Sequence, residues 1–320
     1  MIQRPKIGLA LSGSAGRAAA HVGIIEVFLE NGIPIDVIVG CSSGALVAVS
    51  YAAGTMDAMR QISLTINKRI LWDHVSLRGA RGGLFHFHNP VAEDTLKKIT
   101  KGLKFEDLPV KAGVTTSDIR SGELITITAG SLTQALKASV ALPGLFEPVM
   151  INNRLLVDGG LINVVPALPT KQLGADIVIG IDLARTKFLY QRKLWFWRII
   201  RSLRRLVGIE YVHYQIISPL TSKILDRLES NGYKRSHVPN MLRVFFWGVD
   251  HSFDVEKELS EEQRACDIMI EPDVKTWSGK WGLNNIWGIY QEGRRAGLAA
   301  IPQIRQLMAK HEQETEKVKV

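Results

Sequence analysis

A serine between two glycines is the side chain in this sequence best placed to act as a nucleophile. Residues 40–44 read Gly-Cys-Ser-Ser-Gly, a GxSxG pentapeptide that follows an apolar run, Ile35 to Val39, and opens a run of small residues, Ala45 to Ala53. In a sharp strand-to-helix turn, a Cβ at Gly40 or Gly44 would crowd the backbone, and the serine is pushed out toward substrate. The helix N-terminus favours the negative charge that acyl transfer develops. We therefore predict that Ser42 is a nucleophile rather than part of an ordinary tight turn.

A second group of small residues precedes this motif. Residues 12–17 read Ser-Gly-Ser-Ala-Gly-Arg and separate an apolar run, Ile7 to Leu11, from an expected helix, Ala18 to Asn31. A right-handed crossover between parallel strands would place this loop beside Ser42, where its N–H groups could approach an oxyanion within about 3 Å. The residues predicted to form this oxyanion hole are Gly13, Ser14, Ala15, Gly16 and Arg17. The alternative is a phosphate loop, which is the weaker interpretation because neither GxGxxG nor GxxxxGKS/T is present.

A carboxylate ends another apolar run. Residues 155–160 read Leu-Leu-Val-Asp-Gly-Gly. We expect Asp158 to face the same sheet edge as Ser42 and to accept the serine proton as general base, while Gly159 and Gly160 give the backbone clearance. An ordinary Asp-Gly turn is the alternative, and it would be preferred if the GxSxG motif were absent.

A Ser-His-Asp triad would require a histidine late in the chain. The candidates after Asp158 are His213, His237, His251 and His311. None of them lies in a distinctive motif, and His21, on the first expected helix, is expected to pack or to support the loop. We therefore prefer a Ser42–Asp158 dyad, in which burial and proximity compensate for the weak basicity of a carboxylate.

The elements that must position these groups alternate between strand and helix, which indicates an α/β fold with a mainly parallel sheet. Beyond the two N-terminal strands, further strands are expected at Val110 to Ser117, Leu124 to Ala129, Arg154 to Val157, Ile177 to Asp182, Leu242 to Val249 and Cys266 to Ile270, with helices between them. A last helix is expected from Asn284 to about Met308, and no internal repeat is apparent.

Composition limits the class of protein. The chain has 320 residues, 46% of them hydrophobic, and so has ample material for one large core or two smaller ones. Cys41 and Cys266 form no disulfide framework or metal-ligand spacing, which favours a reducing, cytoplasmic compartment. The first apolar run is too short for a signal peptide, and no stretch reaches the roughly 18 apolar residues of a membrane span.

The formal net charge of +9 is partly explained by one segment. Residues 187–239 break the alternation, and we expect them to be a helical insert or lid within a single catalytic domain, 1–320. Interleaved basic and aromatic residues suit an anionic membrane surface, here the inner face of the membrane. The residues predicted to contact it are Trp195, Phe196, Trp197, Arg198 and Arg201. Packing of this segment on the core or on a second subunit explains the pattern equally well, and no nucleic-acid partner is expected because no recognisable module is present.

The three motifs, in this order, resemble the patatin-like phospholipase family. Its pattern has a GGGxxG-type loop near the start, GxSxG about thirty residues later, and a DGG or DGA aspartate farther on. Residues 20–23, Ala-His-Val-Gly, are similar to the family's AHxG stretch, and residues 138–148 resemble its ASxAxPGxFxP segment. The resemblance covers about Lys6 to Leu183, returns weakly around Cys266 to Pro272 and in the last helix, and is closest to the compact bacterial members.

This resemblance implies a three-layer α/β/α fold, a Ser42 nucleophile and an Asp158 base. It also implies hydrolysis of fatty-acyl esters in phospholipids or lysophospholipids, with no metal or other cofactor. The chain departs from the family pattern at Ser14, Ala15 and Ala18, where glycines are usual, and at Cys41, where Thr or Gly is usual.

A single misaimed oxyanion donor could lower turnover about 100- to 1,000-fold. A catalytically weak or inactive membrane-associated regulator with the same fold therefore stays open as an alternative, as does a nucleotide-binding α/β protein. The sequence predicts no oligomeric state.

Overall fold

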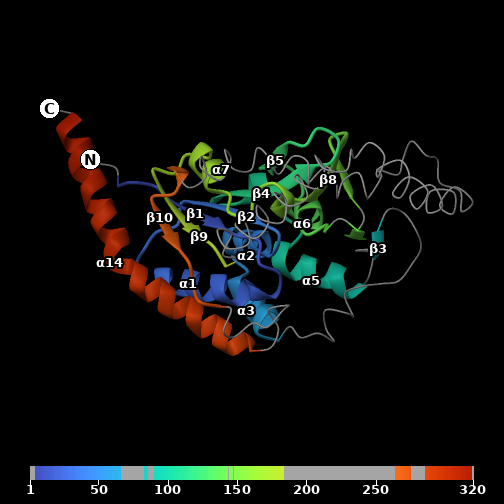
Figure 1. Ribbon diagram of the computed structural model, residues 1–320, viewed down its shortest axis with the longest axis horizontal. Coiled ribbons are helices and arrows are strands. Elements are labelled where there is room, and N and C mark those ends of the chain that lie inside the picture. Colours follow the sequence, from blue (N-terminus) through green and yellow to red (C-terminus); the bar gives the residue numbers. More distant parts are fainter. Residues whose placement is uncertain are drawn as a thin grey trace, which may run out of the picture.

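The computed structural model has a central sheet with helices on both faces (Figure 1). The structure describes residues 4–65, 83–85, 90–142, 144–146, 148–183, 264–274 and 285–318. The eight strands of the sheet run in the order β10-β9-β1-β2-β4-β8-β7, and β5 pairs with β4 beside this path. The α/β class and the three-layer arrangement predicted from the sequence are therefore confirmed.

The middle of the sheet is parallel. It consists of β1 (Ile7–Leu11), β2 (Val37–Cys41), β4 (Lys111–Asp118), β9 (Ile177–Ile181) and β10 (Ile268–Ile270). All residues of β1, β2 and β9 are buried, as expected for apolar strands that are covered on both faces. The structure ends β2 at Cys41, directly before Ser42, two residues later than the apolar run alone suggested.

One side of the sheet is antiparallel. Strand β8 (Arg154–Asp158) pairs with β4, and β7 (Val149–Ile151) and β5 (Leu124–Ile127) complete this part. Asn152 and Asn153 have φ values of 49° and 60°, which suits the tight hairpin between β7 and β8. A separate two-stranded sheet joins β3 (Gly83–Phe85) to β6 (Gly144–Phe146). Neither β7 nor the β3/β6 pair was predicted, because three-residue strands are too short to show a clear hydrophobic period.

Most helices of the described residues lie on one face of the sheet. They are α1 (Ala18–Glu30), α2 (Ser43–Ala52), α3 (Met56–Thr65), α5 (Pro90–Thr100), α6 (Leu132–Ser139) and α14 (Ile286–Val318). Helix α7 (Ala167–Gln172) covers the opposite face, where a smaller apolar cluster includes Ala10 and Val178. The larger cluster contains Ile7, Leu9 and Leu11 of the same strand β1, so the side chains alternate between the two layers.

Helix α14 is longer than predicted. It continues past the expected end at Met308 to Val318 and contains Pro302. Proline removes one helical hydrogen bond, but Ile301 and Ile304 on either side are buried in the core, so packing holds this turn of the helix in place. Part of the helix then extends beyond the sheet (Figure 1).

Two expectations fall outside the described residues: the basic segment 187–239 and the strand Leu242 to Val249. Within the described part of the chain, no helix is both long enough and apolar enough to cross a bilayer.

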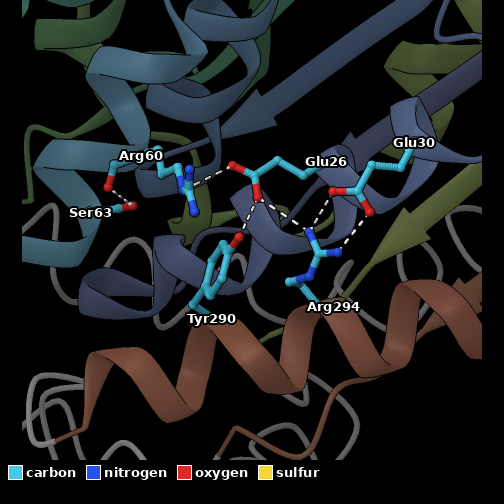
Figure 2. A network of polar contacts seen from close by, with 6 residues as sticks. All are labelled: Glu26, Glu30, Arg60, Ser63, Tyr290 and Arg294. Carbon is cyan, nitrogen blue, oxygen red and sulfur yellow. Dashed lines mark hydrogen bonds and ion pairs between the residues drawn. The ribbon is translucent and has the colours of Figure 1, made fainter.

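Helices α1 and α14 approach each other closely and are joined by polar contacts (Figure 2). Arg294 of α14 binds the Glu30 carboxylate through both terminal nitrogens, at 2.9 and 2.7 Å. Tyr290 Oη donates to Glu26, and Arg60 of α3 lies 3.4 Å from the same carboxylate and over the Tyr290 ring. This network fixes α14 against the helix that leads directly out of the predicted oxyanion loop.

We predict that Gly293→Ala destabilises the protein, because a Cβ at this position would lie 2.2 Å from the Ala20 carbonyl oxygen and would push α14 away from α1. Overpacking of this kind typically costs about 1–3 kcal/mol. Gly297→Ala on the same helix is the matched control: its Cβ would lie 3.3 Å from Ile24 Cα, and the gain in helix propensity of up to about 1 kcal/mol offsets the tighter packing. The measurement is the free energy of unfolding from urea titration, and equal values for the two variants would contradict the prediction.

Candidate active site

Ser42 lies in a strained turn between β2 and α2. Its backbone has φ 51° and ψ −121°, a conformation that non-glycine residues adopt rarely and mainly where the surroundings enforce it. A Cβ at Gly40 would lie 2.4 Å from the Gly44 oxygen, and a Cβ at Gly44 would lie 2.5 Å from the Leu11 oxygen. The turn therefore requires glycine on both sides of the serine, as the GxSxG spacing predicted, and Ser42 itself is partly exposed.

A second serine, which was not predicted from the sequence, supports the turn between β2 and α2 that carries Ser42, here called the elbow. The Ser42 N–H donates to Ser139 Oγ at 2.8 Å, and this buried hydroxyl donates in turn to the Thr115 carbonyl at 2.8 Å. Ser139 thus links the turn to the neighbouring strand β4 through α6. It lies in the segment 138–148 that resembled the family, which is the signal that could have identified it.

Asp158 and Ser42 meet along one edge of β4, because β8 and β2 pair with consecutive stretches of that edge while β5 pairs with the other edge. Cys41 pairs with Thr115 in the register of β2 and β4, and Asp158 pairs with Thr116 in the register of β4 and β8. The two strand ends therefore meet at the same level of the sheet, although β8 runs antiparallel and brings its aspartate in from the opposite direction. The Ser42 side chain is close enough to the Asp158 carboxylate to lower its pKa, and this carboxylate is 2% exposed.

Backbone and thiol groups complete the surroundings of this carboxylate. The Gly160 N–H donates to Asp158 Oδ1 at 2.8 Å, and Cys41 Sγ lies 3.9 Å from the same oxygen. A Cβ at Gly159 would lie 2.7 Å from the Thr115 oxygen, so this position allows the turn after β8 to pass close to β4. Gly159 thus allows the close approach to β4, and Gly160 supplies a hydrogen-bond donor to the carboxylate.

The electrostatics of Asp158 suit a base that is available near neutral pH. Burial raises its pKa to about 6, while the Ser42 side chain, the Gly160 N–H and the Cys41 thiol act in the opposite direction. Burial and the nearby Asp158 charge raise the pKa of the Cys41 thiol well above its ordinary value, so the thiol is neutral and serves as a weak donor. A carboxylate with a pKa near 6 is a stronger base than one with the ordinary value of 3.8.

The predicted oxyanion loop lies against the elbow. A Cβ at Gly13 would be 3.1 Å from Ser42 Cβ, which shows how closely the loop passes the serine. The loop leads into a short 3-10 helix, Ala15–Arg17, and Ala15 has φ 52°. The guanidinium of Arg17 is half-buried, and burial lowers its pKa. The structure thus brings the five predicted loop residues, Ser42 and Asp158 together.

The amides of the loop are not equivalent. The Gly13 N–H donates to the Val164 carbonyl at 3.1 Å, the Ser14 N–H to Ser43 Oγ at 3.0 Å, and the Arg17 N–H to the Ser14 carbonyl at 3.3 Å. Within the described residues, the N–H groups of Ala15 and Gly16 have no protein acceptor. These two amides are therefore the ones available to an oxyanion without rearrangement of the loop.

The described histidines have other surroundings. His21 is fully buried, and its Nε2 lies 2.9 Å from the Ser12 carbonyl oxygen at the start of the loop. Burial lowers its pKa to about 4, so the ring is neutral and Nε2 carries the proton that binds Ser12. His311 lies in the last third of α14. His213, His237 and His251, like the predicted membrane-contact residues Trp195, Phe196, Trp197, Arg198 and Arg201, lie outside the described residues.

We predict that Asp158→Asn stabilises the fold in a pH-dependent way. The folded-state pKa lies above the ordinary 3.8, so the folded protein binds this proton more tightly, and the contribution to stability is lost as pH rises from about 4 through 6. At about pH 8 the variant should be more stable than wild type by about 3 kcal/mol, because each pKa unit corresponds to about 1.4 kcal/mol, and the difference should vanish near pH 4. Urea titrations of both proteins across this range measure it. A constant difference would show that the charge is not the cause.

Comparison with known proteins shows which proteins this chain is similar to. A family model for patatin-like phospholipase matches residues 9–171. An uncharacterised NTE family protein of Mycobacterium tuberculosis is 28% identical over 212 residues, which cover 64% of this chain and 58% of that protein. Patatin-like phospholipase domain-containing protein 7 of Mus musculus is 30% identical over 193 residues, 57% of this chain and 14% of that protein. The chain thus spans less than two thirds of the length of either relative.

Among solved structures, VipD from Legionella pneumophila aligns with a TM-score of 0.37 and 17% identity, over 63% of this chain and 56% of that one. The match to the family model extends over just over half of the 320 residues and includes the GxSxG elbow and Asp158. The chain therefore belongs to the patatin-like phospholipase family.

Proposed function

We propose that this chain is a serine lipid acyl hydrolase in which Ser42 and Asp158 form a catalytic dyad. The observation that carries the proposal is that the strand register brings the buried Asp158 carboxylate to the end of β2, where the partly exposed Ser42 side chain is close enough to lower its pKa. It combines a nucleophile held in a strained, exposed turn with a base whose pKa lies near neutrality. Both features are what general-base activation of a serine requires.

The proposed reaction has two steps. Ser42 Oγ attacks the ester carbonyl carbon while its proton passes to Asp158, and the protonated carboxyl then returns this proton to the departing alcohol as the ester C–O bond breaks. Water attacks the resulting acyl-enzyme while Asp158 again accepts a proton. The carboxyl then returns this proton to Ser42 Oγ as the bond between Oγ and the acyl carbon breaks and the fatty acid is released. One carboxylate thus serves as base and acid in turn.

The negative charge on the carbonyl oxygen needs fixed donors. The amides of Ala15 and Gly16 support this role because they lie in the loop that passes Ser42 and have no acceptor within the described residues. The first turn of α2 adds the partial positive charge of a helix N-terminus. We therefore assign the oxyanion hole to this loop.

Phospholipid or lysophospholipid esters are the proposed substrates. Family membership favours a lipid, and two large apolar side chains are exposed on segments that adjoin β8. Leu142 is 42% exposed and follows Ala141, whose carbonyl accepts the Asp158 N–H at 3.0 Å, and Met150 of β7 is 51% exposed. Exposed apolar side chains on these two segments suit contact with an acyl chain.

We also propose a cytoplasmic protein that contacts the inner face of the membrane peripherally through the segment 187–239, within one catalytic domain. The argument is the composition of that segment, whose cationic and aromatic side chains favour anionic headgroups.

We expect Ser42→Ala and Asp158→Asn to lower ester hydrolysis at least about 1,000-fold, because each removes one half of the dyad. The assay runs from short p-nitrophenyl esters to phospholipid vesicles. A variant in which His213, His237 and His251 are all alanine should keep its activity, which separates the dyad from a triad.

Undiminished hydrolysis by Ser42→Ala would overturn the catalytic assignment. Wild-type protein that hydrolyses no ester and resists labelling by a fluorophosphonate would instead indicate a non-catalytic membrane regulator.

The pH dependence of kcat/KM should follow the titration of Asp158. Asp158 must be deprotonated to accept the serine proton, so kcat/KM should rise with pH and reach half its plateau near pH 6, the pKa of this carboxyl. The triple-histidine variant should show the same midpoint, because the titrating group is the carboxyl. A midpoint near pH 4, or one that moves in the triple-histidine variant, would contradict the assignment.

A further inference from the structure

A pair of buried hydroxyls joins the predicted oxyanion loop to the nucleophile helix. Ser43, the first residue of α2, accepts the Ser14 N–H at 3.0 Å, and its Oγ lies 3.0 Å from Ser14 Oγ. Ser14 is 6% exposed and Ser43 is 7% exposed, so water competes little for these hydrogen bonds. One hydroxyl therefore holds the loop through two bonds, one to its backbone and one to its side chain.

The residue that follows Ser14 has a backbone conformation that needs such support. Ala15 has φ 52°, in the left-handed region that glycine adopts freely and that an L-residue with a Cβ adopts at a cost. A conformation of this kind persists only where neighbouring contacts enforce it. The two bonds between Ser14 and Ser43 are immediately adjacent to this position, and Ala15 carries one of the two amides left available to an oxyanion.

We propose that Ser43 is a positioning residue: its hydroxyl binds Ser14 and keeps Ala15 in the left-handed conformation that aims the loop amides at the reacting carbonyl. This proposal rests on the proposed function, since the effect on turnover passes through the oxyanion hole. Ser42 directly precedes Ser43 at the start of α2, so the nucleophile and the support for the donors that stabilise the oxyanion come from adjacent residues.

The matched pair of variants is Ser43→Ala and Ser50→Ala. Both lie on α2, both are buried, and both lose one hydroxyl, but Ser50 Oγ donates only to the Leu46 carbonyl of its own helix. We expect Ser43→Ala to lower kcat between about tenfold and about 100-fold with KM changed less than about twofold, because misplaced donors act on the transition state and not on substrate binding. Ser50→Ala should leave kcat unchanged.

A rescue variant tests the link to Ala15. Glycine adopts positive φ without strain, so Ala15→Gly combined with Ser43→Ala should recover a large part of the kcat that Ser43→Ala alone loses. Ser14→Ala, which removes the side-chain bond and keeps the amide bond, should have an effect between wild type and Ser43→Ala. Unchanged or raised kcat in Ser43→Ala, or a double variant no better than the single one, would overturn the proposal.

A measurement that does not depend on activity separates this proposal from the proposed function. Amide hydrogen exchange in residues 12–17 should become about tenfold faster or more in Ser43→Ala and stay at the wild-type rate in Ser50→Ala. If wild-type protein hydrolyses no ester, the proposed function fails and the exchange rates alone decide whether Ser43 holds the loop. Equal exchange in the two variants would show that it does not.

Discussion

The close approach of the β2–α2 turn to the end of β1 is the constraint on which the site depends. Gly44 packs so tightly that a Cβ there would lie 2.5 Å from the Leu11 oxygen and 2.6 Å from the Ser12 oxygen. This contact fixes where α2 begins relative to the first strand, and so places the serine before the helix and the loop after the strand side by side. A side chain at Gly44 would therefore push Ser42 away from the loop that follows β1.

Strand β4 sets the distance between Ser42 and Asp158. It pairs with β2 and, farther along the same edge, with β8, while β5 pairs with its other edge. Its Thr115 carbonyl also accepts the Ser139 hydroxyl that supports the elbow. The serine and the aspartate arrive on strands of opposite direction, so only the register of both strands on β4 brings them together. The buried carboxylate that results is destabilising at neutral pH, and the apolar layers on either side of the sheet offset this cost.

The parts of the site that local sequence encodes were predicted, and those that depend on register or packing were not. Ser42 and Asp158 stand out because glycines and apolar strands flank them, and the structure brings both together as expected. The antiparallel direction of β8 was not predicted, because an apolar strand carries no mark of its direction. The Asn152-Asn153 pair was a usable turn signal for the β7–β8 hairpin. The bonds of Ser139 and of Ser14 with Ser43 could not be predicted, because each joins residues about 30 to 100 positions apart that only the folded sheet makes neighbours.

The hydrogen bond from the Gly13 N–H to the Val164 carbonyl closes a path of contacts around the site. From Ser42, the path leads to the neighbouring Asp158 carboxylate, along six residues to Val164, across the hydrogen bond to Gly13, and back to Ser42, whose Cβ would lie 3.1 Å from a Cβ at Gly13. Three segments that are far apart in the chain are thereby tied into one loop of contacts. Such segments must change together during evolution: recombination that exchanges the glycine-rich loop between distant relatives without the stretch after the aspartate would join halves that were never fitted to each other.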